Sequence, residues 1–157
     1  QKLYADTCKF GIENLPTPSM GDVDKNPDTV WRDCVESVDD CMRVVRDSGL
    51  ITFDTSHYAA NRGIADSLVA PVKIIGTHLG HVHISDVSGY SVPFTSVWKE
   101  GVIPGEGNIG EDRFRQLLRH LRDNQPHVGL EIEVANKDFK NPEESKESIR
   151  RVLNWLE

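Results

Sequence analysis

Four short apolar runs of this chain each carry a side chain that could bind a metal ion. Carboxylates stand at the ends of two of these runs and within a third, and an imidazole lies within the remaining one. Three carboxylates and one imidazole make a hard, oxygen-rich donor set, which suits Mn²⁺, Mg²⁺ or Co²⁺ and also accepts Zn²⁺. The side chains are Glu13 in run 9–14, Asp54 in run 50–54, His83 in run 82–86, and Glu131 or Glu133 in run 128–134.

The elements expected to position these side chains are strands that alternate with helices. Each run has the length of a buried strand, and apolar residues recur at helical spacing between the runs. Four such units predict a parallel α/β fold of one domain, residues 1–157, in which ligands gather at the carboxyl ends of the strands. This pattern fits an open doubly wound sheet and a barrel segment equally. The expected helices cover residues 31–45, 64–75, 114–121 and, after a capping pattern at 141–144, the segment to Leu156; residues 55–63 and 87–110 are expected to be loops.

Each of these residues also has an ordinary structural interpretation. An isolated carboxylate at a strand end often caps a helix or stays solvated. His81 and His83 alternate along one run, so both side chains point the same way and either could be a hydrogen-bonded interior histidine. Glu131 and Glu133 also share a face, where paired carboxylates are costly without a cation or another partner. The prediction of a metal site therefore depends on the whole set, one residue per strand.

Several motifs of the chain, taken in order, resemble those of xylose-isomerase-like TIM barrels. That group contains sugar-phosphate isomerases and epimerases, hydroxypyruvate isomerases, and the endonuclease IV DNA-repair enzymes. The resemblance covers essentially the whole chain and is specific as a set, although it names no substrate. The motifs are Glu13-Asn14, Ile-Thr-Phe-Asp-Thr-Ser-His at 51–57, Gly-His-Val-His-Ile-Ser-Asp at 80–86, Pro-Gly-Glu-Gly-Asn-Ile at 104–109, and Gly-Leu-Glu-Ile-Glu-Val at 129–134.

The resemblance implies a fold and a set of roles. The fold is the C-terminal half of a (β/α)₈ barrel, strands five to eight, because a complete barrel needs about 250 residues. We expect the missing N-terminal half to come from more chain, a separate chain or a second copy of this one. His81 is not expected to be a ligand, because the metal-binding imidazole of the family directly precedes the Ile-Ser-Asp segment. The implied metal ligands are Glu13, Asp54, His83 and Glu133, with Glu133 preferred over Glu131; Glu13 and Glu133 act as general base and acid, and His57 faces the substrate or a second metal.

The implied activity is metal-dependent isomerisation or epimerisation of a small sugar or sugar phosphate. A divalent cation would polarise the substrate carbonyl, and the two glutamates would move the neighbouring proton. Whether the proton returns to the next carbon or to the other face of the same carbon stays open. The loop between Ser88 and Gly101, with Tyr90, Phe94 and Trp98, is equally suited to covering a substrate or packing on the barrel rim.

Two alternatives to this activity are less favoured. Endonuclease IV relatives carry an Asp-x-His pair before the Gly-rich loop, where this chain has Lys99 and Gly101, and the net charge of −7 argues against a nucleic-acid surface. A non-catalytic barrel fragment is the other alternative.

No stretch approaches the roughly 20 apolar residues of a membrane span. The three cysteines, Cys8, Cys34 and Cys41, fit no zinc motif and are expected to be free thiols in a reducing, cytoplasmic compartment.

Overall fold

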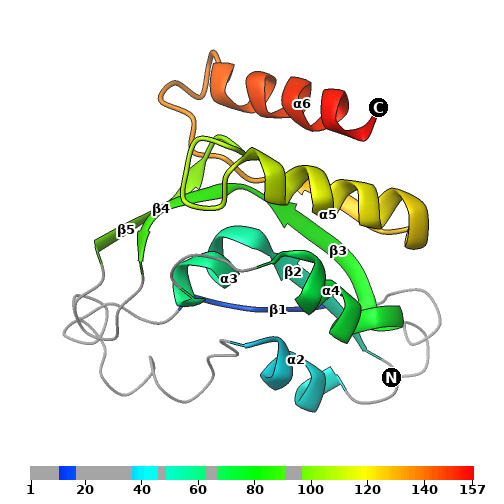
Figure 1. The fold of residues 1–157 in the computed structure, drawn as a ribbon. Coiled ribbons are helices and arrows are strands. Elements are labelled where there is room, and N and C mark those ends of the chain that lie inside the picture. Colours follow the sequence, from blue (N-terminus) through cyan, green and yellow to red (C-terminus); the bar gives the residue numbers. More distant parts are fainter. Residues whose placement is uncertain (1–10, 17–36, 46–48, 63–66, 91–96) are drawn as a thin grey trace, which may run out of the picture.

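The computed structural model describes residues 11–16, 37–45, 49–62, 67–90 and 97–157, and its centre is a parallel sheet (Figure 1). Within these residues the sheet has four strands, β1 (Gly11–Glu13), β2 (Leu50–Asp54), β3 (Leu79–Ile84) and β6 (Gly129–Ile132), in the order β1-β2-β3-β6. Every neighbouring pair is parallel. Each new parallel strand is added beside the previous one, without the reversal of order found in doubly wound sheets. This order fits the part of a barrel that the motifs predicted.

Alternate residues of the central strands divide the sheet into an apolar and a polar face. Ile51 and Phe53 of β2 and Val82 and Ile84 of β3 are fully buried and belong to the hydrophobic core. The residues between them point to the opposite face, because side chains alternate along a strand. On that face, Thr52 is paired with His81 and Asp54 with His83.

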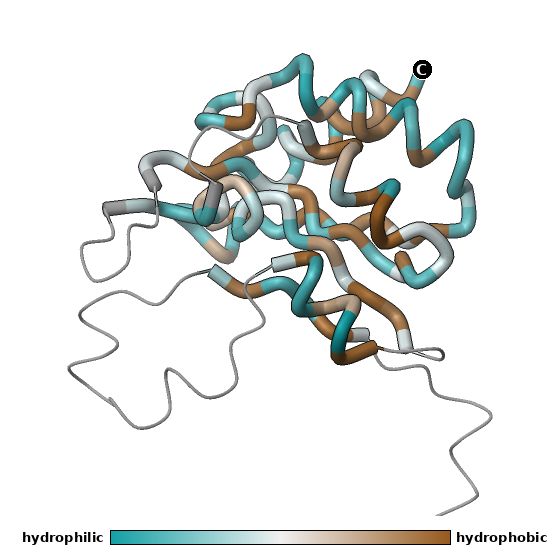
Figure 2. Tube along the Cα trace, turned by 60° about the horizontal axis from the view of Figure 1, so that its bottom comes forward, coloured by the Kyte–Doolittle hydropathy of each residue, from teal (hydrophilic) through white to brown (hydrophobic). Residues whose placement is uncertain are grey.

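Helices cover the apolar face of the sheet. They are α2 (Val38–Val45), α4 (Val69–Ile75), α5 (Glu111–Asn124) and α6 (Glu143–Leu156). The core residues of α5 and α6 include Phe114 and Trp155, whose rings stack at a centroid distance of 6.1 Å. In Figure 2 the hydrophobic segments gather where strands and helices meet, and the hydrophilic ones lie on the outer turns. The polar side chains of the sheet thus remain available on its other face.

The segment expected to be a loop after β2 is instead helix α3 (Thr55–Arg62). The side chain of Asp54 explains its start, because Oδ1 accepts hydrogen bonds from the backbone N–H of His57 at 2.7 Å and from the hydroxyl of Ser56 at 2.8 Å. An aspartate that accepts the free N–H groups of a first turn is a strong helix N-cap. Asp54 therefore ends β2 and begins α3.

The long loop expected between β3 and α5 contains a β-hairpin. Its strands, β4 (Asp86–Tyr90) and β5 (Val97–Val102), pair antiparallel and form a sheet separate from the parallel one. Trp98 is partly buried against the hydrophobic core, so this side chain packs on the protein. Phe94 lies outside the described residues, and the side chain of Tyr90 is not described.

A buried carboxylate holds the turn that follows the hairpin. Asp86 is fully buried, and its two oxygens accept hydrogen bonds from the backbone N–H groups of Gly105, Gly107 and Ile109 at 2.9–3.1 Å. A Cβ atom on Gly107 would lie 2.4 Å from the carbonyl oxygen of Val87 and 2.5 Å from Asp86 Oδ1. The Pro-Gly-Glu-Gly-Asn-Ile motif is therefore a turn wrapped around Asp86.

The helix ends differ in part from the sequence predictions. The expected capping pattern at Asn141 is wrong, since α6 begins at Glu143 without a side-chain cap. In α2, Ser37 accepts a hydrogen bond from the backbone N–H of Asp40 at 3.1 Å. Cys41 on α2 is a buried free thiol whose pKa is raised by burial to about 11, whereas Cys8 and Cys34 lie outside the described residues. Among the helices described, none has the length and apolar character needed to cross a membrane.

Candidate metal centre

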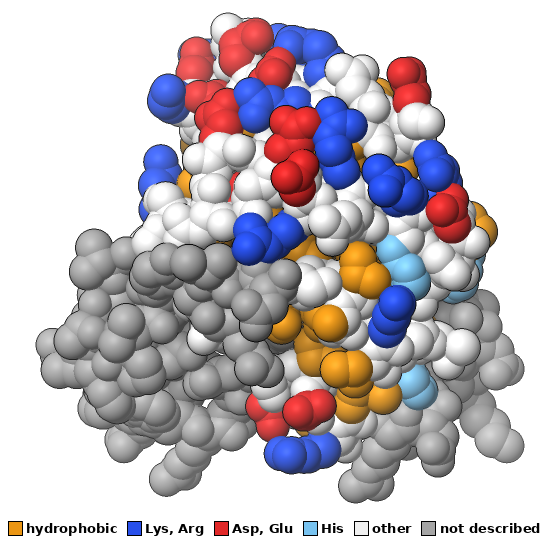
Figure 3. All heavy atoms as spheres, in the orientation of Figure 1, with side chains coloured by type: hydrophobic (Ala, Val, Ile, Leu, Met, Phe, Trp, Pro, Cys, Tyr) orange, Lys and Arg blue, Asp and Glu red, His pale blue; other side chains and the backbone are white. Residues whose placement is uncertain are grey.

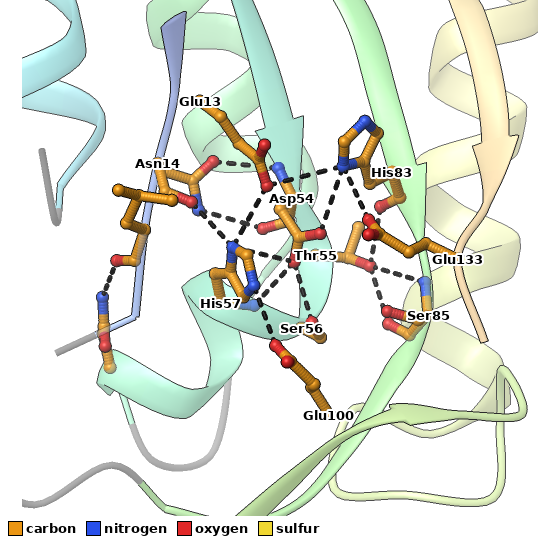
Figure 4. Close-up of polar contacts among 12 residues, drawn as sticks. Glu13, Asn14, Asp54, Thr55, Ser56, His57, His83, Ser85, Glu100 and Glu133 are labelled. Atoms are coloured by element: carbon orange, nitrogen blue, oxygen red, sulfur yellow. Dashed lines mark hydrogen bonds and ion pairs between the residues drawn. The ribbon is translucent and has the colours of Figure 1, made fainter. Parts of the chain in front are cut away.

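Four strand ends bring the predicted ligands together on the polar face of the sheet. Glu13 ends β1, Asp54 ends β2, His83 lies in β3, and Glu133 directly follows β6. One potential ligand atom from each residue lies within 4.8 Å of the other three. Figure 4 shows these side chains turned toward one another from different strands. The geometry can therefore place one cation in contact with all four.

The Nδ1 atom of His83 is the middle of this cluster. It lies 2.8 Å from Glu133 Oε2, 3.4 Å from Glu13 Oε1 and 3.5 Å from Asp54 Oδ2. The atom is buried and, among the described residues, has no partner in hydrogen-bond geometry. A buried polar atom without a hydrogen bond is rare in proteins. A nitrogen donor ringed by three carboxylate oxygens fits a divalent cation, whose bond to that nitrogen would satisfy it.

Asp54 is held so that one of its oxygens stays free for this cluster. Its Oδ1 accepts the hydrogen bonds of the α3 cap, and Oδ2 faces His83. Asn14 fixes the backbone of Asp54 by donating from Nδ2 to its carbonyl oxygen at 3.1 Å and accepting its N–H at 2.9 Å. Asn14 and Asp54 are both almost completely buried. The ends of β1 and β2 are thereby locked side by side.

Three further hydrogen bonds fix the end of β3. The hydroxyl of Thr55 donates to the carbonyl oxygens of His83 at 3.0 Å and Ser85 at 2.8 Å. On the other side, the backbone N–H of Glu133 donates to the carbonyl oxygen of Ile84 at 3.2 Å. Positions of the ligands are thus set by main-chain contacts as well as by the side chains themselves. Neither Thr55 nor Asn14 was assigned a role from the sequence, although both stand next to predicted ligands.

The two glutamates of the last strand end up in different surroundings. Glu133 joins the cluster around His83 Nδ1. Glu131 lies on the other side of the same ring, with Oε2 at 3.6 Å from His83 Nε2 and 3.3 Å from His81 Nε2. The geometry therefore places Glu133, and not Glu131, in the group with Glu13, Asp54 and His83.

The charges of the centre shift its pKa values in opposite directions. Contact with Asp54 is the largest cause that raises the pKa of His83, to about 9. Burial tends to raise the pKa of Asp54, but the contacts with His83 and His57 outweigh it and lower that pKa. Burial is also the largest influence on the pKa of Glu133. It outweighs the attraction of His83, so the pKa of Glu133 is raised. Of these two carboxylates, Glu133 is the better suited to take up a proton.

His57 links the centre to the hairpin. Its Nδ1 lies 3.0 Å from the carbonyl oxygen of Asn14 and 3.2 Å from Glu13 Oε1, and its Nε2 lies 3.0 Å from Glu100 Oε2. Because acceptors face both ring nitrogens, both must carry a proton, which is the cationic form. Burial lowers the pKa of His57, but the contacts with Glu100 and Glu13 outweigh it and raise the pKa to about 10. Glu100 lies on β5, in the segment expected to be a loop, so this contact was not predictable from the sequence.

Replacing Glu100 by Gln should lower the pKa of His57 by about one unit, because a neutral amide stabilises the imidazolium less than a carboxylate does. A titration of the His57 ring signals by NMR measures this directly. The stabilisation that charged His57 gives the fold should be fully present below pH 6.5 and lost as the pH rises toward about 10. The matched control is Glu111→Gln on the exposed face of α5. An unchanged pKa in Glu100→Gln would mean that the two side chains do not meet in solution.

A cavity of about 220 Å³ opens beside the centre. This volume is below the range of about 300–1,000 Å³ typical of sites for drug-sized ligands, so the cavity suits a small molecule. Its wall combines the polar groups of the centre with backbone and small side chains. The lining residues are Asp54, Ser56, His57, Ser85, Glu100, Gly101, Glu133, Val134 and Ala135.

The positions that correspond to the additional nuclease ligands offer no donor. Gly101 has φ +70°, and a Cβ atom there would lie 2.7 Å from the backbone nitrogen of Ala135. Lys99 is exposed. Acidic and basic side chains alternate over α5 and α6 on the face drawn in Figure 3, without a large basic patch there.

Comparison with known proteins gives the family. An inosose dehydratase of Yersinia enterocolitica is 27% identical over 130 residues, which cover 75% of this chain and 42% of that protein. The chain thus spans less than half the length of this curated relative. A family model described as a xylose isomerase-like TIM barrel matches residues 1–157. Together with the parallel sheet and its ligand cluster, this match shows that the chain belongs to the xylose isomerase-like TIM barrel family.

Proposed function

We propose that this chain carries the active centre of a divalent-metal-dependent isomerase or epimerase acting on a small sugar or sugar phosphate. The family and the similarity to an inosose dehydratase support a sugar-modifying enzyme. The observation that carries the proposal is the cluster itself, in which three carboxylates from three strands surround the buried Nδ1 of His83. The ion would be Mn²⁺, Mg²⁺, Co²⁺ or Zn²⁺, held by Glu13, Asp54, His83 and Glu133.

When bound, such a cation supplies Lewis acidity that polarises a carbonyl and makes the neighbouring C–H bond more acidic. Proton transfer belongs to the two glutamates. Glu133 lines the cavity and has a raised pKa, so it is placed to accept a proton from the substrate carbon. Glu13 lies at the end of β1, which β2 and β3 separate from β6 in the sheet. A substrate bound at the cation would therefore lie near two carboxylates from different strands, which suits removal of a proton and its return elsewhere.

His57 is proposed to orient the substrate. It lines the cavity, and its N–H groups are held by Glu100 on one side and by Glu13 and Asn14 on the other. A fixed cationic donor at this place could exchange the Glu100 contact for a substrate oxygen. Glu100 would then keep the imidazole charged until the substrate arrives.

Dehydration is a second candidate reaction, favoured by the inosose dehydratase similarity. It begins with the same removal of a proton next to a carbonyl, and differs only in that the adjacent hydroxyl then leaves. The endonuclease IV alternative has less support, because of the net charge of −7 and the residues at positions 99 and 101. A non-catalytic role would require that the four side chains bind no metal.

The first step can be tested without knowing the product. The chain with Mn²⁺ is incubated in D₂O with ketoses, aldoses, their phosphates and inososes, and loss of the α-proton is followed by NMR. We expect exchange with at least one substrate, its loss in Glu133→Gln, and its retention in the matched variant Glu131→Gln. An exchange rate per molecule of chain that increases with protein concentration would support a second copy as the source of the missing half of the barrel. Metal binding without exchange in any substrate would contradict the enzymatic proposal.

A further inference from the structure

A second group of metal-competent side chains lies on the same face of the sheet. His81 and His83 stand two residues apart on β3, and Glu131 is the partner of His83 on β6. One potential ligand atom from each lies within 4.8 Å of the others. Glu131 Oε2 is 3.3 Å from His81 Nε2 and 3.6 Å from His83 Nε2. None of the three carboxylates of the proposed catalytic centre takes part in this group.

The two imidazole rings are fixed relative to each other. They meet edge to face, with centroids 5.5 Å apart and planes inclined at 84°. The Nδ1 side of His81 lies against the backbone of β6, because a Cβ atom on Gly129 would be only 2.5 Å from Nδ1. A glycine at this position therefore makes room for the ring, which leaves its Nε2 on the side of Glu131.

His81 Nε2 is the unsatisfied atom of this group. It is buried and, within the described part of the chain, has no partner in hydrogen-bond geometry, although Glu131 is close. A simple His–Glu ion pair would bring a well-directed N–H to the carboxylate at about 2.7–2.9 Å. The longer, poorly directed contact instead resembles the spacing of two ligands that share a cation.

We infer that His81 Nε2, His83 Nε2 and Glu131 form a second cation site, next to the proposed catalytic centre. Two imidazole nitrogens and one carboxylate suit borderline metals such as Zn²⁺, Cu²⁺ or Ni²⁺ better than Mg²⁺ or Mn²⁺. The two sites would thus differ in the ions they prefer. The two sites share His83, but this inference does not depend on the proposed function, because the other two residues of the second site, His81 and Glu131, have no part in that function.

His83 faces both sites, with Nδ1 toward the catalytic centre and Nε2 toward the second site. A neutral imidazole has one nitrogen lone pair to offer and carries a proton on its other nitrogen. An ion bound through Nε2 therefore leaves a proton on Nδ1. This nitrogen then cannot bind a second ion, so the catalytic centre is weakened. Occupation of the second site by a borderline metal should inhibit occupation of the first by Mn²⁺.

Cu²⁺ is a suitable probe, because pulsed EPR counts the imidazoles that bind it. With one equivalent of Cu²⁺, the native chain should show two bound imidazoles, and His81→Asn should show one. The two-imidazole signal should persist in Glu133→Gln, which weakens only the catalytic centre, and in His127→Asn, which changes an exposed histidine away from both sites. Retained Mn²⁺ binding by His81→Asn would show that this variant is folded.

One imidazole in the native chain, or two in His81→Asn, would overturn the second site. Either result would leave the proposed function standing, since that depends on Mn²⁺ binding through Glu133. Conversely, loss of the two-imidazole signal in Glu133→Gln would show that copper occupies the catalytic centre, and would also overturn the inference.

Discussion

Replacing Glu133 by Gln should lower the affinity of the chain for Mn²⁺ by about 100-fold or more, whereas Glu131→Gln should leave it nearly unchanged. Loss of an outer-shell partner alone lowers metal affinity by about 10–100-fold, and Glu133 is proposed as a direct ligand. Its Oε2 lies 2.8 Å from His83 Nδ1, in the middle of the cluster. The substitution also removes one negative charge, and charge count strongly affects the affinity of oxygen-rich sites.

Titration calorimetry at one equivalent of Mn²⁺ measures this difference. The two variants form a matched pair, because both residues lie on the same face at the end of the same strand and are similarly exposed. His83→Ala should also abolish binding, since it removes the nitrogen donor. If Glu131→Gln loses Mn²⁺ and Glu133→Gln keeps it, the fourth ligand is Glu131 and the assignment of Glu133 is wrong.

Replacing Asp86 by Asn should reduce the free energy of unfolding by about 3 kcal/mol or more, the largest stability effect we expect in this chain. The fully buried carboxylate accepts hydrogen bonds from several backbone N–H groups of the turn at residues 105–110. An amide has one acceptor oxygen, and its NH₂ group would face N–H donors that it cannot satisfy. At least two buried donors would then lose their partner.

Urea unfolding followed by circular dichroism measures the change, with linear extrapolation to water. The control is Asp112→Asn, an exposed acidic residue in the first turn of α5, for which the helix dipole predicts a loss of about 0.3–1 kcal/mol. Equal losses in the two variants would mean that the turn does not depend on Asp86.

The convergence of Glu13, Asp54 and His83 was predictable from the sequence for a simple reason. Each lies in a short apolar run, and the carboxyl ends of parallel strands meet at one edge of a sheet. Strand β2 has the predicted limits of residues 50 and 54, because its apolar run is bounded by Gly49 and by the start of α3. The choice of a barrel over a doubly wound sheet needed the resemblance, and the match to the family model then confirmed it.

The parts that the sequence did not reveal are stabilised by tertiary contacts. Helix α3 has few apolar residues, and its start depends on the side chain of Asp54, which was interpreted as a metal ligand followed by a loop. Strand β4 contains Gly89 with φ +82°, a poor strand former, and Asn108 donates to its carbonyl oxygen at 2.7 Å from the following turn. Neither feature has a periodic signature. Glu100 was missed for the same reason, because its strand was not expected.

The placement of one cluster residue on, or directly after, each of four parallel strands also couples ion binding to folding. The first and the last of the four, Glu13 and Glu133, are 120 positions apart in the sequence, yet their ligand atoms lie within 4.8 Å of each other. An ion held there would act as a cross-link between all four strands of the parallel sheet. Because a ligand that binds only the folded state stabilises it in proportion to RT ln(1 + [L]/Kd), the concentration of free metal would set how firmly this sheet holds together.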